Sequence, residues 1–351
     1  MPTWGQILTE LGSTQDVPGL SKTDIVRRKY LTALHEHTGR NTILYATKFT
    51  QPSGTPRESV EVTIRDEDLQ GLMETLHGLK GPNLDLILHS PGGSAEAAAA
   101  FVTYLRSKFK HIRVIVPSLA MSAATMVACA ADEIVMGKHS FLGPIDPQIV
   151  INAKIGQRMA PAQAILEQFR MAQRECADAG RMAAWIPILD QYGPDLLVQC
   201  ETASLRAEKV VKEWLRRYMF RGEGKAGAEK ADNIAKWLSA HKEHLSHSRH
   251  LSRSDLRRRK LKVTSLEKDQ IAQDLFLSVF HATTHTFNLT HAVKIIENHK
   301  GKAFMRVMQT ISVGPMPQQL IPMIQPQLPP IPQAPPAPQG GPPAGEKQTQ
   351  E

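Results

Sequence analysis

The chain has 351 residues, of which 41% are hydrophobic and 22% charged, with a formal net charge of +8. This is the composition of a globular protein with a sizeable core. Its few cysteines argue against a disulfide framework and have no metal-type spacing: Cys129, Cys176 and Cys200. The longest nearly apolar run, 123–131, is far shorter than the roughly 20 residues of a membrane span. The amino terminus lacks the pattern of a secretory signal, so we expect a cytoplasmic protein.

Hydrophobic patterning predicts a helix over 20–40 and a strand over 41–47. Between residues 66 and 136 we expect a helix capped by Asp66, a strand at 84–89, a helix at 95–109, a strand at 111–117, a helix after Ser122 and a strand at 133–136. Apolar strands that alternate with helices are typical of a mostly parallel sheet with helices on its faces. The fold class is therefore α/β.

The second half of the chain is predicted to be mainly helical. We expect helices over 160–220 with a Pro/Gly break at 185–195, a further helix within 229–262, an amphipathic helix over 265–287, and a last helix or strand over 291–309. Twelve of the 24 prolines lie between Pro315 and Pro343, among Gln, Gly and Ala. This composition predicts a disordered tail, either solubilising or a docking site for a proline-reading partner.

Two short segments carry the chemistry. In the first, the strand 84–89 runs into Ser90-Pro91-Gly92-Gly93-Ser94, where glycine allows positive φ and close approach of the backbone to a ligand. In the second, Ser122 stands between a strand and a helix of small residues, where helix N–H groups favour negative charge. Together they could supply a serine nucleophile and an oxyanion hole. Serine at such a position is also a common helix cap.

The segments 84–93, 120–137 and 140–148 together resemble the ClpP-like serine peptidases, and are most similar to the serine dehydrogenase proteinase group, which is related to signal peptide peptidase A. The similarity extends over about residues 20–310. It includes 27–45 upstream, and downstream a segment at 245–263 that in the family carries a histidine, a short helix and a closing strand. The resemblance implies a ClpP/crotonase-type core and assembly into homo-oligomers.

The resemblance implies that Ser122 is the nucleophile and that Ala123 N–H is one oxyanion donor. Gly92 or Gly93 would supply the second donor. Asp146 lies in the GPIDPQ motif of the resembled group and is expected to orient another group at the site. An Asp-Pro turn is the alternative interpretation of that residue.

The general base departs from the known patterns. The Clp protease proteolytic subunit has a histidine about 25 residues after its serine, where this chain has 143–147 without a histidine. Signal peptide peptidase A uses a lysine, and Lys138 and Lys154 are the lysines between Ser122 and Arg206. Lys154 is our first candidate, ahead of Lys209 and of His139, which lies in a predicted surface turn. Because the histidine is missing, a second alternative is that the chain is a catalytically inactive relative of these peptidases.

Two other clusters are conspicuous. Histidines recur every three residues at His241, His244, His247 and His250. A metal site there is conceivable, but a solvated basic surface is favoured, because few carboxylates accompany them. From Lys236 to Lys262, nine basic residues face only Glu243 and Asp255. An exposed helix or an acidic neighbouring subunit is preferred to nucleic acid as its partner, since no aromatic residue follows Trp237 within this basic stretch.

We therefore predict a serine peptidase that acts on peptides or proteins, needs no metal or other cofactor, and has no ATPase motif. The alternatives are a crotonase-like acyl-CoA enzyme, which would not need Ser122, and an inactive oligomeric scaffold. The expected division is an N-terminal segment (1–19), the peptidase domain with helical additions (20–265), a helical extension (266–312) and the proline-rich tail (313–351).

Overall fold

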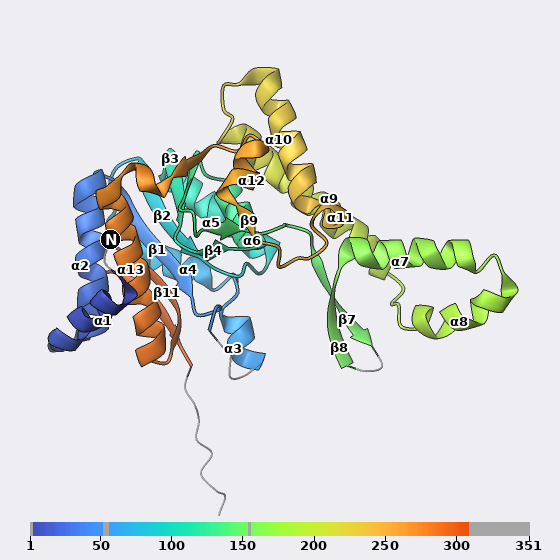
Figure 1. Ribbon diagram of the computed structural model, residues 1–351, viewed down its shortest axis with the longest axis horizontal. Coiled ribbons are helices and arrows are strands. Elements are labelled where there is room, and N and C mark those ends of the chain that lie inside the picture. Colours follow the sequence, from blue (N-terminus) through green and yellow to red (C-terminus); the bar gives the residue numbers. More distant parts are fainter. Residues whose placement is uncertain (1–2, 52–55, 154–155, 309–351) are drawn as a thin grey trace, which may run out of the picture. The chain divides into compact units, whose positions relative to one another are not determined.

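The computed structural model describes residues 3–51, 56–153 and 156–308 (Figure 1). Its centre is a seven-stranded sheet with the strand order β10-β5-β3-β2-β1-β11-β12. The strands are β1 (Asn41–Thr47), β2 (Asn83–His89), β3 (His111–Val116), β5 (Glu133–Met136), β10 (Val263–Ser265), β11 (Ala292–Asn298) and β12 (Ala303–Val307). Strands β10 to β1 run parallel, and β11 and β12 are antiparallel additions at one edge. The predicted α/β class with a mostly parallel sheet is confirmed.

Both faces of the sheet are covered by helices, which explains the apolar strands. On one face Leu44 and Ala46 of β1 pack with α2 (Lys22–Thr38) and α13 (Gln270–Leu289). On the other face Ile43 and Tyr45 pack with α4 (Asp68–Leu76), α5 (Ala95–Lys108) and α6 (Ala123–Cys129). Every residue of β1 and β11 is buried, as expected of strands without a solvent-facing side.

The ends of helix α2 are set by capping residues in the local sequence, but the predicted start of α4 is not. Helix α2 begins after Ser21, whose side chain accepts from Asp24 N–H, and ends at Gly39 in the left-handed conformation. The prediction that Asp66 caps the next helix is wrong. Helix α4 begins at Asp68, and its N-cap residue, Glu67, makes no side-chain capping bond.

The region after residue 147 differs from the prediction in two places. An unpredicted hairpin, β7 (Gln148–Ala153) and β8 (Gly156–Pro161), precedes α7 (Ala162–Glu175). The expected break at 185–195 is shorter than predicted, because α8 (Ala179–Leu189) continues through Pro187 near its end. A proline there removes a hydrogen bond only from the last turns. The long helices α9 (Leu196–Arg217) and α10 (Gly224–Ser239) then pack against each other.

The remaining elements are short or terminal: α1 (Trp4–Ser13), α3 (Pro56–Glu61), β4 (Leu119–Ala120), β6 (Phe141–Leu142), α11 (His241–His244), β9 (Leu251–Ser252), α12 (Arg253–Arg258) and a 3-10 turn (Leu266–Lys268). Strands β4, β6 and β9 form a small sheet of their own. The short helix and closing strand expected near residue 250 correspond to α12 and β10.

The segment after residue 265 supplies α13 and the two antiparallel strands β11 and β12 to the central sheet. The last element, for which a helix or a strand was expected, is this strand pair. The predicted proline-rich tail (313–351) lies outside the described residues. Among the residues that are described, no helix has both the length and the apolar character needed to cross a bilayer.

Candidate active site

Ser122 occupies a sharp turn between strand β4 and helix α6. Its φ and ψ are 51° and −120°, a backbone conformation that a non-glycine residue rarely adopts. Such strain persists only where the surrounding structure imposes it, and it is concentrated at functional sites. A strained strand–turn–helix serine is the device by which serine hydrolases expose their nucleophile. The helix-cap alternative fails, because the half-buried Ser122 side chain makes no capping bond.

The Pro-Gly-Gly turn lies directly against Ser122. Strand β2 ends at His89, and the next residue, Ser90, pairs with the β4 segment. Ser90 N–H donates to the carbonyl oxygen of Leu119 (3.2 Å), and the Ser90 carbonyl oxygen accepts from Met121 N–H (2.9 Å). Gly92 has a φ of 96°, and a Cβ there would lie 2.7 Å from Ser122 Cβ and 2.6 Å from the carbonyl oxygen of Met121. Only glycine permits this approach of the two backbones.

The backbone N–H groups around Ser122 are not equivalent. Gly92 N–H donates to the side-chain oxygen of Ser90 at 3.2 Å. Within the described part of the chain, neither Gly93 N–H nor Ala123 N–H has a hydrogen-bond acceptor. Gly93 is exposed, and Ala123 is the first residue of α6. These two N–H groups are therefore the ones left to bind a negatively charged oxygen beside Ser122.

Asp146 is a buried carboxylate that binds two imidazoles. Its side chain is 1% exposed and accepts from His247 Nδ1 at 2.7 Å, from His241 Nδ1 at 2.9 Å and from Gln148 Nε2 at 3.1 Å. Because an ionised carboxylate only accepts hydrogen bonds, both rings carry their proton on Nδ1. The Nε2 atom of each ring is then the nitrogen that can take up a proton.

The small sheet brings these residues to one end. Strands β4 and β6 are parallel, and β9 is antiparallel to β6. Ser122 follows the end of β4, Asp146 follows the end of β6, and His247 precedes the start of β9. All three residues thus leave the same end of the sheet. His241 reaches Asp146 from a different element, the start of α11.

The favoured interpretation of the histidine cluster as a solvated surface is wrong for three of the four histidines; only His250 is exposed. His241 and His247 bind Asp146, His244 is buried against the carbonyl of Trp237 (2.7 Å), and His250 stacks on the ring of Phe141. Burial lowers the pKa of His244. The regular spacing in the sequence was the signal, and Asp146 was the partner that connected it to the site. No cluster of metal-ligating side chains occurs among residues 3–51, 56–153 and 156–308.

The sequence also predicted other base candidates. Lys154 falls outside the described residues. The exposed His139 packs its ring against Gly137, as expected of a surface turn, and Lys138 N–H donates to Glu267. His89 is fully buried between aromatic rings, and burial lowers its pKa to about 3.

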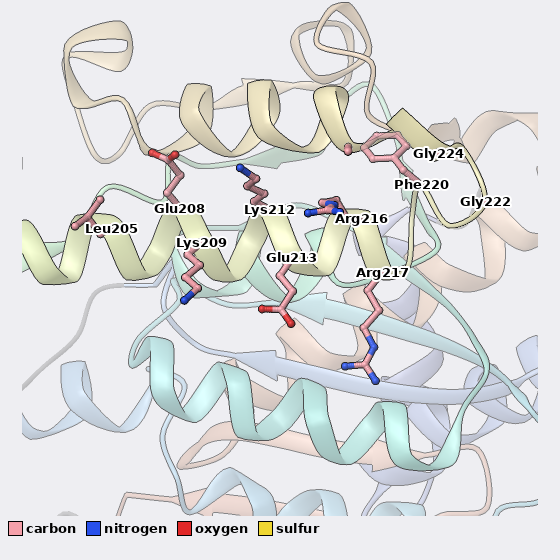
Figure 2. A pocket seen from close by; sticks show the side chains of 11 residues that line it. Leu205, Glu208, Lys209, Lys212, Glu213, Arg216, Arg217, Phe220, Gly222 and Gly224 are labelled. Atoms are coloured by element: carbon pink, nitrogen blue, oxygen red, sulfur yellow. The ribbon is translucent and has the colours of Figure 1, made fainter. Parts of the chain in front are cut away.

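A large pocket lies apart from Ser122. It has a volume of about 1030 Å³ and lies along α9 and the start of α10 (Figure 2). The remaining lysine candidate, Lys209, lines it, together with Glu208, Lys212 and Phe220. Figure 2 shows Lys209 and Glu213 pointing to one side of α9, and Glu208 and Lys212 to the other. Its lining includes none of the residues described above around Ser122 and Asp146.

Known proteins are similar to parts of this chain. Two uncharacterised proteins of Methanocaldococcus jannaschii are similar to the chain: one is 39% identical over 97 residues, and the other 33% identical over 157 residues. The matches cover 27% and 45% of this chain, and 32% and 44% of the relatives' own lengths. Residues 66–186, which contain the Gly-Gly turn, Ser122 and Asp146, match a family model described as ClpP-like SDH-type serine proteinase. Over these residues the chain is similar to the ClpP-like SDH-type serine proteinase family.

Proposed function

We propose that the protein is a serine peptidase in which Ser122, His247 and Asp146 act together. The carrying observation is that buried Asp146 binds His247 Nδ1 at 2.7 Å, at the end of the small sheet where Ser122 stands in its strained turn. A nucleophile, a base and a third group that orients the base are what serine catalysis requires.

In the proposed first step, Ser122 Oγ attacks the peptide carbonyl carbon while His247 Nε2 takes the hydroxyl proton. The carboxylate of Asp146 stabilises the resulting imidazolium. The carbonyl oxygen gains the negative charge and is held by Gly93 N–H and Ala123 N–H. Support for Gly93 rather than Gly92 comes from hydrogen bonding, since Gly92 N–H already donates to Ser90.

In the second step, the tetrahedral intermediate collapses and His247 donates its proton to the leaving amine. The product is an ester between Ser122 Oγ and the acyl half of the substrate. Water, deprotonated by His247, then attacks the ester carbonyl carbon. The imidazolium returns this proton to Ser122 Oγ as the carboxylic acid product leaves. In both steps the transferred proton is thus carried by His247 Nε2.

Lys154 stays an alternative base, as predicted from the sequence. It follows Asp146 by eight residues, and burial can lower the pKa of a lysine far enough for its neutral amine to accept a proton. The imidazole is preferred because two of its requirements are met by described residues: a carboxylate that fixes its proton on Nδ1, and a position at the same end of the small sheet as Ser122.

The test is the intact mass of the protein after treatment with a fluorophosphonate, which forms a covalent adduct only with an activated serine. We expect one adduct on the parent protein and none on Ser122→Ala. An adduct that persists in Ser122→Ala would contradict the proposal. A folded parent without any adduct would favour the inactive scaffold, whereas unchanged hydrolytic activity in Ser122→Ala would favour crotonase-like chemistry.

We also propose that the protein assembles with copies of itself, as the family resemblance implies. Support comes from large apolar side chains that are exposed on the hairpin and on α9, notably Met159 (70%), Val198 (65%) and Leu205 (69%). Light scattering of the parent and of Met159→Glu tests this. A parent that is monomeric at micromolar concentration would contradict it. The cytoplasmic location, the domain boundaries and a partner for the proline-rich tail stay predictions.

A further inference from the structure

A buried ion pair lies behind the Gly-Gly turn. Lys294 of β11 and Asp68 at the start of α4 are joined by a contact of 2.6 Å between Nζ and Oδ1, with side chains only 1% and 2% exposed. Lys294 lies far beyond the matched family segment, which ends at residue 186. The pair therefore connects the strand addition at the sheet edge to the segment that contains the site.

The remaining hydrogen bonds of this pair fix a short stretch of backbone, residues 63–65. Lys294 Nζ donates to the carbonyl oxygen of Thr63 at 2.7 Å. The second oxygen of Asp68 accepts from Arg65 N–H at 3.0 Å and from the hydroxyl of Tyr45 at 2.7 Å. Both ends of the stretch are thus bonded to the ion pair or to one of its members.

The residue between them, Ile64, bonds directly to the Gly-Gly turn. Its N–H donates to the carbonyl of Gly92 at 2.7 Å, and its carbonyl accepts from Ser94 N–H at 3.0 Å. A Cβ on Gly93 would lie 2.4 Å from the Ile64 carbonyl oxygen. The backbone of Ile64 therefore fixes the position and the orientation of the peptide group that carries Gly93 N–H.

Stability alone does not explain an ion pair in this place. Desolvation of two charges commonly offsets their attraction, and apolar side chains of similar volume stabilise a core equally well. Burial lowers the pKa of Lys294, against the attraction of Asp68. The ammonium group is bonded to Asp68 and Thr63, which directs it to the backbone and away from a role as base.

We propose that Lys294 and Asp68 are positioning residues of the oxyanion hole, holding Gly93 N–H in place through the backbone of Ile64. This inference rests on the proposed function for its effect on catalysis. The structural half, that the pair fixes the Gly-Gly turn, has its own measurement.

The experiment compares Lys294→Met and Asp68→Asn with a matched control on the same strand, Glu297→Gln. Glu297 is fully buried and is paired with Arg27 and Arg28 of α2, on the other face of the sheet. For each variant we would measure Tm, the saturating rate of fluorophosphonate labelling, and the reagent concentration for half-maximal rate. Amide hydrogen exchange at Ile64 and Ser94 reports the turn independently of catalysis.

We expect all three variants to lower Tm. Only Lys294→Met and Asp68→Asn should lower the saturating rate, by about 10- to 100-fold, with the half-maximal concentration within about threefold. Their Ile64 and Ser94 amides should exchange faster than in the control. Equal saturating rates in Lys294→Met and Glu297→Gln, or unchanged exchange at these two amides, would overturn the inference.

A milder variant guards against loss of folding. Tyr45→Phe removes one hydrogen bond to Asp68 and keeps the buried ring, and it should lower the saturating rate by about two- to fivefold. A rate equal to that of the parent, with faster exchange at neither amide, would count against the network. Failure of the proposed function can be distinguished from failure of this inference. If labelling survived in Ser122→Ala, the proposed function would fail, but hydrogen exchange at Ile64 and Ser94 would still test whether the ion pair fixes the Gly-Gly turn.

Discussion

The two halves of the proposed site are encoded in different ways. The Gly-Gly turn and Ser122 are local features, each a strand that ends in a tight turn, and β4 pairs directly with the residues after β2. Asp146 and His247 are 101 positions apart and meet because β6 and β9 pair. The Gly-Gly turn and Ser122 can therefore be identified from short sequence motifs, whereas the contact between Asp146 and His247 depends on the long-range pairing of β6 with β9.

The largest effect is expected from removing the proposed base. In His247→Ala, hydrolytic activity should fall by about 10⁴- to 10⁶-fold, since the serine loses its proton acceptor. His250→Ala is the matched control, because His250 stacks on Phe141 and does not contact Asp146. Hydrolysis of a fluorescent casein measures both. Full activity in His247→Ala with a loss in His241→Ala would assign the base to the other imidazole.

Asp146→Asn should lower activity by about 10⁴-fold, slightly less than loss of the base. The amide keeps the shape of the carboxylate, but it can neither fix both Nδ1 protons nor stabilise an imidazolium. The same casein assay, with Tm as the check on folding, measures the effect. If Asp146 only closed an Asp-Pro turn, Asp146→Asn would retain nearly full activity.

How much of this site could be predicted from the sequence depends on how far apart in the chain its residues lie. Ser122, the two glycines and the strands on either side were predictable, because strand, turn and helix signals are local. The role of the histidine segment was not, since the spacing of His241 to His250 is equally typical of a polar surface. Only the antiparallel pairing of β9 with β6 selects His247, and a two-residue strand carries no clear pattern. The β7–β8 hairpin was missed for a different reason: its strands have six residues each, but β8 is largely exposed and lacks apolar alternation.

The local half of the site can be tested with a single methyl group. Gly92→Ala places a Cβ within 2.7 Å of Ser122 Cβ and of Ala123 N, so the two backbones must separate. We expect a loss of about 10²- to 10³-fold in activity, comparable to removal of an oxyanion donor. Gly78→Ala is the control: Gly78 also has a positive φ, of 75°, but open space around its Cβ position. It should cost about 1 kcal/mol of stability and leave the activity per folded molecule unchanged.

The smallest expected effect concerns stability and pH at His89, beside the Gly-Gly turn. Burial lowers its pKa from 6.5 to about 3, so the folded protein holds the neutral ring. This contribution to stability is complete above pH 6.5. It is lost as the pH falls toward 3, because the unfolded chain binds the proton first. Between pH 6.5 and 5 the loss should approach about 1.4 kcal/mol per pH unit.

Urea unfolding of the parent and of His89→Asn at pH 7.5 and 5.0 measures this loss. Asparagine can replace Nδ1 as the acceptor of Leu119 N–H but does not titrate. Its stability should therefore fall less between the two pH values, by about 2 kcal/mol, than that of the parent. His291→Asn, at an exposed position, should behave like the parent. Identical pH dependence in parent and His89→Asn would refute the assignment.

The central claim is that an imidazole held by Asp146 activates Ser122. Its most direct test is the rate of fluorophosphonate labelling of Ser122, followed by intact mass in the parent, His247→Ala and Lys154→Ala. The account predicts a rate at least about 10²-fold lower in His247→Ala and a rate within threefold of the parent in Lys154→Ala. The reverse result, rapid labelling without His247 and slow labelling without Lys154, would contradict it and return the base to the lysine.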